Sequence, residues 1–340
     1  MKIEEVLSLV RPHLRDLQPY SSARDEFDQS AVEKNKFIYL DANENPFDTG
    51  YNRYPDPYQH DLKKKVSSIK DIPANQIFLG NGSDEAIDLI IRLFCGEGDN
   101  ILIPTPTYGM YKVSADINNI TVKAQSLTEN FQLPQSFQPD ERTRVVFLCS
   151  PNNPSGNLLD IHLQNFNCIV VVDEAYIDFT SNPSFTKKLD QFPNLIVLQT
   201  LSKAWGLAGL RLGMAFARPE VISLLNKIKP PYNISSATQQ IALKELQKDN
   251  TSIVQKIISE RTRLANELLK IKTIKKVYPS DANFLLVKID DAGNVYTNLI
   301  IDGIVVRDRS RVKLCDDCLR ITIGTPEENN RLLEALKSAS

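Results

Sequence analysis

Apolar runs and amphipathic segments alternate along this chain from about residue 60 to residue 230. Short apolar runs that end in turn residues are typical of buried strands, whereas apolar residues spaced by three and four are typical of helices. This repeated order is the pattern of βαβ units, so the sequence predicts an α/β fold with a mostly parallel central sheet flanked by helices. The clearest runs are IFL at 77–79, VVFLC at 145–149, CIVVVD at 168–173 and LIVLQT at 195–200.

A second unit is expected after Pro230 and Pro231, which interrupt the pattern. Amphipathic helices follow, and then the strand-like segments ANFLLVKI, GIVVRD and CLRITI, an order that indicates a smaller α+β domain. Because 340 residues exceed one ordinary core, we expect a large domain at 46–230, a small domain at 231–340, and an N-terminal helix and arm at 1–45 that packs on the small domain. One helix of the small domain should bury a stripe made of Ile253, Ile257, Leu264 and Leu268.

Lys203 is the first candidate for a catalytic residue. It follows the run at 195–200, so it should lie just past the carboxyl end of a strand, where open α/β sheets bind their ligands. A lysine that is partly desolvated and near other cations loses proton affinity and can react with a carbonyl carbon. Ser202 and Arg211 could hold an anion beside it. An isolated lysine on such a loop is usually a solvated surface group, but other segments accompany this one.

Two other predicted strands end in residues suited to a ring-shaped cofactor. Asp173 closes the run CIVVVD, where a buried carboxylate either caps the next turn or pairs with a protonated pyridine nitrogen. Asn153, in the loop SPNNPSG, and Tyr176 offer neutral donors for a phenolate oxygen. The composition of that loop is also adequate for a plain turn.

A glycine-rich turn precedes an expected amphipathic helix, whose apolar side carries Ile87, Ile90, Ile91 and Phe94. The turn, Gly80-Asn81-Gly82-Ser83, would let the backbone and the first amides of the helix approach a phosphate. Asp84 and Glu85 argue partly against an anion there, yet acidic residues are also ordinary partners of a helix dipole at this end.

Taken together, these segments resemble the fold-type I pyridoxal-phosphate aminotransferases over nearly the whole chain. The order Asn153, Asp173-x-x-Tyr176, Ser202-Lys203 and then Arg211 is specific to that family. The resemblance implies an aspartate-aminotransferase-like fold and pyridoxal phosphate as the cofactor. Within the family the chain is most similar to the histidinol-phosphate aminotransferases, on the motifs PYSSAR (19–24), LDANENP (40–46), NRYPDP (52–57), GNGSDE (80–85), VVRDRS (305–310) and CLRITIGT (318–325).

The resemblance also implies roles for residues around the cofactor. Lys203 would be the catalytic Schiff-base lysine, Asp173 would face the pyridine nitrogen, and Tyr176 with Asn153 would hold the phenolate oxygen. Tyr108 would stack on the cofactor ring, whereas a half-buried core position is expected for Tyr111. The other cofactor-binding residues would be Gly82, Ser83, Asp84, Ser202, Arg211 and, reaching over from the second subunit of a homodimer, Tyr54.

Substrate contacts are implied for arginines near the carboxyl terminus. Arg320 would bind a substrate carboxylate, best that of glutamate, because histidinol phosphate has a hydroxymethyl group in its place. Tyr20 and Arg307 would face the phosphate, but Arg309 and Arg311 lie in the same segment and could share it. The expected substrate-binding set is Tyr20, Asn153, Arg307 and Arg320.

The implied reaction converts histidinol phosphate and 2-oxoglutarate into imidazole acetol phosphate and glutamate, reversibly and by a ping-pong course. Three alternatives stay open. An aromatic or broad-specificity aminotransferase, or a decarboxylase of a phosphorylated amino acid, would keep the same cofactor residues. A cofactor-binding regulatory module would normally adjoin a basic DNA-binding domain, for which this chain has neither spare length nor charge.

Charge and hydropathy narrow the classes of partner. Lys and Arg number 40 against 42 Asp and Glu, a net charge of −2 with no dense basic block, so neither nucleic acid nor a membrane surface is an expected partner. No apolar run approaches the ~18 residues of a membrane helix, and the first residues lack the charge pattern of a signal peptide. We therefore expect a cytoplasmic protein.

Five cysteines and three histidines give only a weak metal signal. An odd number of cysteines in a long chain of this kind indicates reduced thiols. Cys315 and Cys318 have the spacing of a ligand pair, but no second pair and no histidine accompanies them. We expect a short turn there and no bound metal.

Overall fold

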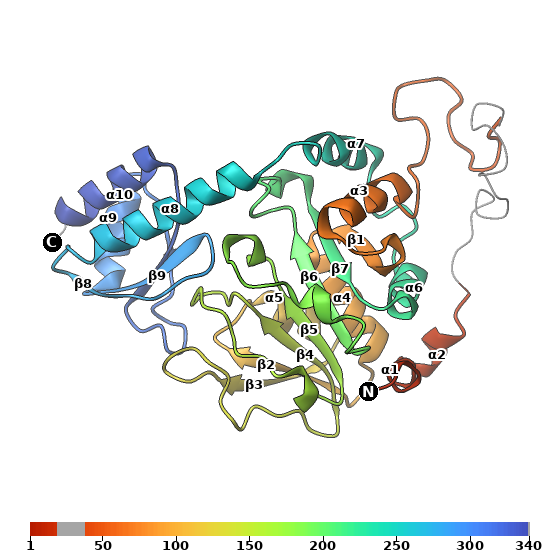
Figure 1. The fold of residues 1–340 in the computed structure, drawn as a ribbon, viewed down its shortest axis with the longest axis horizontal. Coiled ribbons are helices and arrows are strands. Elements are labelled where there is room, and N and C mark those ends of the chain that lie inside the picture. The colour runs from red at the N-terminus through yellow and green to blue at the C-terminus, as the bar shows by residue number, and fades with distance from the viewer. Residues whose placement is uncertain (19–37, 339–340) are drawn as a thin grey trace.

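A computed structural model of the chain describes residues 1–18 and 38–338, and its larger unit is built on a seven-stranded sheet. Figure 1 shows this sheet between layers of helices. Neighbouring strands are parallel except for the two pairs made by β7, and the expected mostly parallel sheet is thereby confirmed. In spatial order the strands are β1 (Ile77–Asn81), β7 (Leu212–Phe216), β6 (Leu195–Thr200), β5 (Ile169–Asp173), β4 (Thr143–Cys149), β2 (Asn100–Thr105) and β3 (Thr121–Ser126).

Two hydrophobic cores, one on each face of the sheet, explain why its central strands are apolar throughout. Side chains of a strand alternate between faces, so Val170 and Val172 of β5 enter one core and Ile169 and Val171 the other. Helices α3 (His60–Lys70) and α7 (Ser236–Glu245) cover the first core. The second core is covered by α4 (Ser83–Phe94), α5 (Met110–Ile117) and α6 (Pro219–Ile228).

The smaller unit is a four-stranded antiparallel sheet with helices packed against it. The order of its strands is β10 (Arg307–Asp308), β11 (Cys318–Thr322), β9 (Phe284–Ile289) and β8 (Ile274–Val277). The accompanying helices are α8 (Thr251–Leu268), α9 (Ala292–Ile301) and α10 (Pro326–Ser338). In Figure 1, α8 runs from the larger unit to the smaller one. This arrangement confirms the expected smaller α+β domain.

The N-terminal helix lies against the larger unit. Val6 of α1 (Ile3–Ser8) and Val10 are buried in the core under α4 and α6, and Arg11 donates its backbone N–H to the carbonyl of Leu93 at 3.0 Å. The prediction that this helix packs on the small domain is therefore wrong, because its apolar face is covered by α4. The remaining short elements are α2 (Pro12–Arg15), η4 (Ala74–Gln76), η5 (Leu163–Asn165), η6 (Ile177–Phe179), η7 (Phe185–Lys188) and η8 (Ala208–Leu210).

Two predictions about the start of the smaller unit also need correction. The chain does not leave the larger unit at Pro231, because Ile234, just before α7, is fully buried in the core that α3 covers. Helix α7 therefore belongs to the larger unit. The buried stripe of α8 contains Val254 in place of Ile253, which is 55% exposed.

A small apolar cluster joins the two units next to the predicted site. It brings Tyr176 and Phe179 of the larger unit against Phe284 of β9. Arg261 of α8 crosses the same junction, donating from its guanidinium to the carbonyl of Ala282 at 2.7 Å and to that of Phe179 at 3.4 Å. The smaller unit is thus held close to the carboxyl ends of the large sheet.

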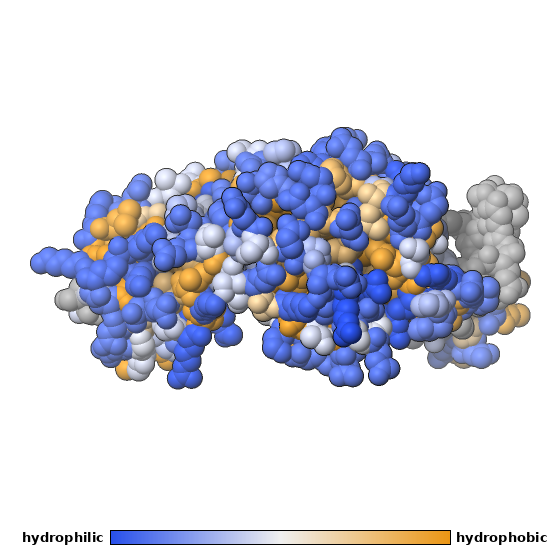
Figure 2. All heavy atoms as spheres, turned by 90° about the horizontal axis from the view of Figure 1, so that it is seen from below, coloured by the Kyte–Doolittle hydropathy of each residue, from blue (hydrophilic) through white to orange (hydrophobic). Residues whose placement is uncertain are grey.

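Hydrophilic side chains predominate on the face of the molecule drawn in Figure 2, and apolar ones form patches between them. None of the helices within residues 1–18 and 38–338 is long and apolar enough to cross a membrane. Even α8, with 18 residues, carries Glu260, Arg261 and Arg263.

Candidate functional site

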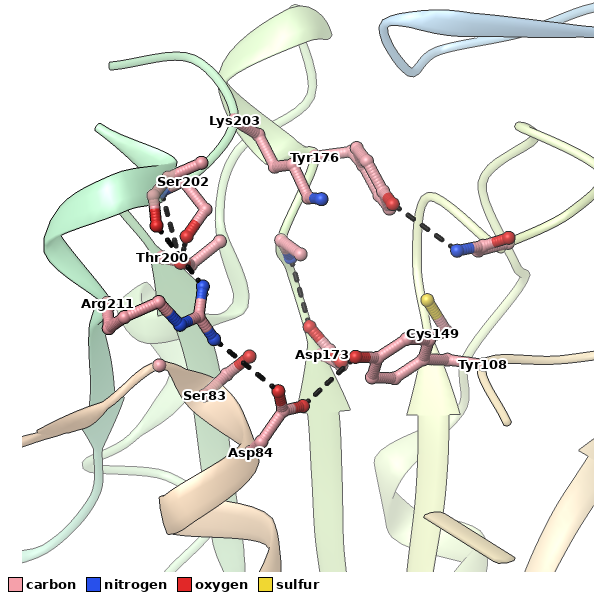
Figure 3. A pocket seen from close by; sticks show the side chains of 14 residues that line it. Ser83, Asp84, Tyr108, Cys149, Asp173, Tyr176, Thr200, Ser202, Lys203 and Arg211 are labelled. Atoms are coloured by element: carbon pink, nitrogen blue, oxygen red, sulfur yellow. Dashed lines mark hydrogen bonds and ion pairs between the residues drawn. The ribbon is translucent and has the colours of Figure 1, made fainter. Parts of the chain in front are cut away.

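Most of the residues predicted to bind the cofactor or take part in catalysis meet in one cavity, at the carboxyl ends of the strands of the large sheet (Figure 3). Asn153 follows β4, Asp173 ends β5 and Lys203 follows β6, so three neighbouring parallel strands deliver them to the same place. The turn after β1 adds the N-terminus of α4. The predicted residues that line the cavity are Gly82, Ser83, Asp84, Tyr108, Asn153, Asp173, Tyr176, Ser202, Lys203 and Arg211.

Asp173 is a carboxylate with only 2% of its surface exposed. One oxygen, Oδ1, accepts the backbone N–H of Ala175 at 3.1 Å, and Oδ2 accepts the hydroxyl of Tyr111 at 2.7 Å. Burial raises the pKa of Asp173 to about 6, although both hydrogen bonds and the charge of Lys203 lower it. No ion pair reaches this carboxylate from the described residues, so it is suited to a cationic ligand.

Tyr111 has a contact that the sequence did not reveal. We expected a half-buried core tyrosine, and the side chain is fully buried, but its hydroxyl is also the donor to Asp173. Its ring is stacked on Phe147, with centroids 4.8 Å apart, and meets the edge of Tyr108 at 5.6 Å. The need of a buried phenol for a hydrogen-bond partner is the one signal that pointed to such a contact.

Lys203 points its Nζ into the cavity (Figure 3). Desolvation lowers the pKa of this amine, and repulsion by Arg320 and Arg211 lowers it further, while attraction by Asp173 opposes them. The nitrogen lies 5.7 Å from the centre of the Tyr176 ring. A larger neutral fraction makes the amine a better nucleophile and a better base near neutral pH.

Asn153, Tyr176 and Arg320 form a chain of contacts between the two units. Asn153 donates from Nδ2 to the hydroxyl oxygen of Tyr176 at 3.3 Å and accepts from Nη1 of Arg320 at 2.5 Å. The guanidinium of Arg320 lies 5.3 Å from the ring centre of Phe284. A residue of the small sheet therefore reaches a residue at the edge of the large sheet.

A cradle for an anion lies at the N-terminus of α4. Gly82 has a φ of +75°, and a Cβ there would lie 2.6 Å from Nη2 of Arg211. Gly213 of β7 packs so closely that a Cβ would lie 2.2 Å from the backbone nitrogen of Ser83. These glycines let the first amides of α4 and the Arg211 guanidinium share a small space, beside the hydroxyl of Ser202 (Figure 3).

Asp84 and Glu85 do not occupy the anion site at the N-terminus of α4. Asp84 accepts the hydroxyl of Tyr108 at 3.0 Å, and its other oxygen lies 3.7 Å from Nη2 of Arg211. A long, half-exposed ion pair of this kind is weak and leaves the guanidinium available to another anion. Glu85 turns back and accepts the backbone N–H of Asn81 at 2.5 Å.

These residues fit pyridoxal phosphate, the cofactor implied by the resemblance. Asp173 offers an unpaired buried carboxylate to a pyridine nitrogen, and Arg211 with the first amides of α4 offers cationic and neutral donors to a phosphate. Lys203 supplies an amine and Tyr108 an aromatic ring in the same cavity.

Three predicted residues do not line the cavity, and a fourth falls outside the described chain. Arg320 is one of the three, and it touches Asn153, which does line the cavity. Tyr54 is half exposed and stacks on Tyr232, with ring centroids 4.4 Å apart. Arg307 is exposed on β10, opposite Arg320 in the pairing of β10 with β11. Tyr20 lies outside the described residues.

Cys315 and Cys318 are free, buried thiols. Burial raises the pKa of Cys315 to about 12. The backbone N–H of Cys318 donates to the carbonyl of Cys315 at 2.9 Å, in the turn that the sequence predicted. No group of three or more possible metal ligands occurs within residues 1–18 and 38–338.

Comparison with known sequences points to one family. The sequence profile described as "Aminotransferase class I and II" matches residues 29–336. A curated protein of Parabacteroides distasonis, "Histidinol-phosphate aminotransferase", is 54% identical over 348 aligned positions that cover 99% of both chains.

Solved structures share the fold. The histidinol-phosphate aminotransferase from Clostridium acetobutylicum matches with a TM-score of 0.75 at 26% identity, over 85% of this chain and 91% of that one. The enzyme of the same name from Sinorhizobium meliloti, solved in complex with pyridoxal-5'-phosphate, matches with a TM-score of 0.74 at 23% identity, over 85% and 84%. The fold class expected from the sequence is confirmed.

Replacing Tyr111 with Phe should raise the pH at which the protein loses pyridoxal phosphate. Without the hydroxyl donor, the pKa of Asp173 should rise above its value of about 6. Only the ionised carboxylate pairs with a protonated pyridine nitrogen, so affinity should fall as the pH drops through that pKa, at a higher pH in the variant. Cofactor titrations followed by absorbance between roughly pH 5 and pH 8 measure the two midpoints.

Tyr108→Phe is the matched control, because its hydroxyl donates to Asp84 and not to Asp173. This variant should keep the midpoint of the wild type. Identical midpoints for the wild type and Tyr111→Phe would show that the hydroxyl does not control the charge of Asp173.

Proposed function

This chain belongs to the class I and II aminotransferases, and from this premise we propose that it is the histidinol-phosphate aminotransferase of histidine biosynthesis. One observation carries the chemistry: the amine of Lys203 and the unpaired buried carboxylate of Asp173 face the same cavity. The choice of substrate is supported by the full-length likeness to a curated protein of that name.

The proposed reaction exchanges an amino group for a keto oxygen in two halves. L-histidinol phosphate gives up its amino group and leaves as imidazole acetol phosphate. 2-Oxoglutarate then takes the amino group and leaves as L-glutamate. Both substrates use one cavity in turn, which makes the course ping-pong. The reaction is reversible because an amino group and a keto group are exchanged in both directions.

Lys203 and Asp173 divide the proton chemistry between them. When bound, pyridoxal phosphate supplies a carbonyl carbon for the amine and a ring that accepts the electron pair left behind by the α-proton. The Nζ of Lys203, whose pKa desolvation lowers, would take the proton from the substrate α-carbon and deliver it to the cofactor carbon that carried the carbonyl oxygen. The ionised Asp173, held by Tyr111, keeps a proton at the ring nitrogen.

The other residues orient the reactants. Arg211, Ser202 and the amides at the start of α4 hold the cofactor phosphate, and Tyr176 with Asn153 holds the ring oxygen. Arg320 binds the carboxylate of glutamate. Its Nε is buried and has no hydrogen-bond partner among the described residues, so it can donate to that carboxylate.

Two alternatives would use the same cofactor residues. An aromatic or broad-specificity aminotransferase would accept donors without a phosphate. A decarboxylase of a phosphorylated amino acid would release CO2 and would not need 2-oxoglutarate. Both differ from the proposed enzyme in the substrate pocket alone.

We also place the enzyme in the cytoplasm. All five cysteines are free and buried, which is typical of proteins in reducing compartments.

The working unit in this proposal is a homodimer that exchanges Tyr54 between its two sites. Residues 38–54 carry large apolar side chains that the described part of the chain leaves exposed, as expected of a surface that meets a second copy. They are Ile38, Leu40, Phe47, Tyr51 and Tyr54, each exposed by 50% or more.

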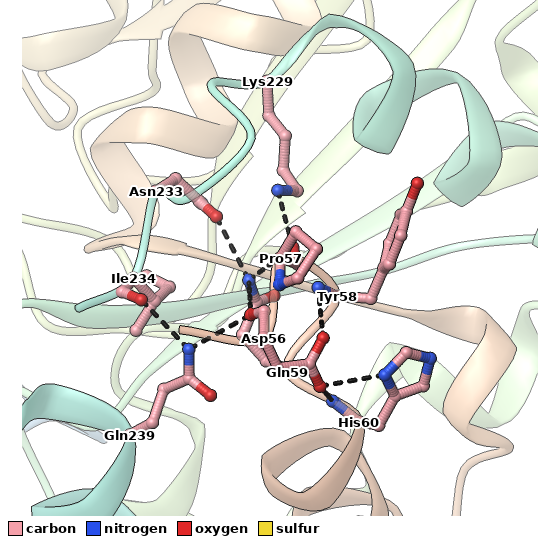
Figure 4. A network of polar contacts seen from close by, with 9 residues as sticks. All are labelled: Asp56, Pro57, Tyr58, Gln59, His60, Lys229, Asn233, Ile234 and Gln239. Atoms are coloured by element: carbon pink, nitrogen blue, oxygen red, sulfur yellow. Dashed lines mark hydrogen bonds and ion pairs between the residues drawn. The ribbon is translucent and has the colours of Figure 1, made fainter. Parts of the chain in front are cut away.

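A polar network fixes the base of this segment (Figure 4). The carboxylate of Asp56 accepts the backbone N–H of His60, the first residue of α3, at 2.6 Å. Lys229 donates from Nζ to the carbonyl of Pro57 at 2.8 Å. The chain that follows Tyr54 is therefore anchored, and in the proposed dimer the tyrosine reaches the cofactor phosphate of the other subunit.

A panel of amino donors tests the proposed reaction. The kcat/KM for L-histidinol phosphate with 2-oxoglutarate should exceed that for phenylalanine or tyrosine by about 30-fold or more, because a desolvated charged contact is worth ~2 to 5 kcal/mol. Similar values for all donors would support the broad-specificity alternative. Release of CO2 from a phosphorylated amino acid, without transamination, would support the decarboxylase.

Heterodimers of Lys203→Ala with Tyr54→Ala test the exchange of Tyr54. If the tyrosine acts across the interface, one heterodimer site carries both defects and the other carries none. Mixing two nearly inactive homodimers should then restore about one active site per heterodimer. If Tyr54 acts within its own chain, each heterodimer site carries one defect, and mixing gives no gain once subunit exchange has been verified with two affinity tags.

A further inference from the structure

Three arginines of the small domain, Arg307, Arg309 and Arg320, lie on two paired segments, and Arg320 touches Asn153 of the cavity. We infer that Arg309 is a further specificity residue, which binds the phosphate dianion of the substrate together with Arg307 and Arg320, and that its neighbour Arg311 takes no part. The inference rests on the proposed function and deepens it, because it states which side chains select a phosphorylated donor.

The pairing of β10 with β11 places the three arginines on one face. Arg307 lies opposite Arg320, and the backbone N–H of Arg309 donates to the carbonyl of Cys318 at 2.9 Å, which continues the pairing. Because side chains alternate along a strand, Arg307 and Arg309 point to the same side as Arg320. Arg320 reaches Asn153 at 2.5 Å, so this face looks toward the cavity.

The cluster has positive charge without a counter-charge. None of the three arginines makes an ion pair with the described residues, and the Nε atoms of Arg309 and Arg320 are buried without a hydrogen-bond partner. Burial lowers the pKa of Arg309, and repulsion by Arg320 and Arg307 lowers it further. Arg309 and Arg320 are partly buried, so their mutual repulsion is costly, and an anion bound between them and Arg307 would offset that cost.

Arg311 differs from Arg309 in each of these respects. Its side chain is exposed, and none of its atoms is both buried and unpartnered. The pKa of Asp308 is lowered first by the backbone hydrogen bond from Ser310 and also by the charge of Arg311, which acts on it more than that of Arg309 does. Arg311 thus supplies a matched control with the same charge in the same segment.

The charge of the ligand should decide how much Arg309 matters. A phosphate monoester carries about −1.5 to −2 near neutral pH, whereas a carboxylate carries −1. Arg307 and Arg320 are sufficient for the single charge of a glutamate carboxylate, whereas Arg309 adds affinity for a dianion. Loss of Arg309 should therefore discriminate against the phosphorylated substrate.

Arg309→Gln and Arg311→Gln in the holoenzyme test this assignment. Arg309→Gln should weaken L-histidinol phosphate and inorganic phosphate, measured by calorimetry, by about 10- to 100-fold, and should change glutamate by less than about 3-fold. Arg311→Gln should change each of them by less than about 3-fold. Arg309→Lys should recover part of the loss, because it keeps the charge without the planar fork.

The pH dependence of phosphate binding distinguishes a binding role of Arg309 from a purely structural one, because loss of a structural residue would not change that dependence. In the wild type, affinity should increase from about pH 5 to pH 7 as the second phosphate proton leaves with a pKa near 6. Arg309→Gln should flatten this increase, whereas Arg311→Gln should preserve it.

Equal weakening of phosphate and glutamate by Arg309→Gln, or values that match those of Arg311→Gln throughout, would overturn the assignment. A wild type that does not transaminate histidinol phosphate would instead contradict the proposed function, and the binding of inorganic phosphate would still decide the role of Arg309. If Arg309→Gln fails to fold, as judged by thermal unfolding and cofactor absorbance, the phosphate-to-glutamate ratio of Arg309→Lys decides.

Discussion

A carboxylate buried at the end of β5 is the constraint on which the rest of the site depends. Removal of Asp173 from water disfavours its charge, and hydrogen bonds from Tyr111 and Ala175 offset only part of that cost, so its pKa is about 6. In the proposed enzyme a protonated ring nitrogen would supply the missing positive charge, and the cofactor would complete a polar arrangement that the folded chain leaves unbalanced.

The amine of Lys203 is under the influence of the carboxylate of Asp173 and of the cations Arg320 and Arg211. Asp173 favours the charged form of the lysine, but desolvation and the charges of Arg320 and Arg211 outweigh this effect. Arg320 thus acts on the reactive amine and is also the proposed carboxylate ligand. The contact of Tyr176 with Phe284, whose ring centroids are 5.2 Å apart, holds the two units in the relation that this arrangement requires.

The sequence predicted that Asn153, Asp173 and Lys203 meet in one place, because each ends or follows an apolar run and parallel strands bring their carboxyl ends to the same side of a sheet. Contacts between distant segments were harder to predict. Apolar spacing marks a buried face but does not say which surface covers it, so the packing of the N-terminal helix was assigned to the wrong unit. Ile253 and Val254 are adjacent and both apolar, and only packing selects Val254. The hydroxyl of Tyr111 likewise finds its partner only in the folded chain.

Borohydride reduction of the cofactor-loaded protein, followed by peptide mapping, tests most directly whether Lys203 bonds to the cofactor in this cavity. Reduction makes the bond between a lysine nitrogen and the cofactor carbon permanent. We predict about one modification per chain, on the peptide that contains Lys203, and none in Lys203→Ala, which should still hold some cofactor through the phosphate contacts at α4. Modification of a different lysine, or none on well-loaded protein, would contradict the assignment.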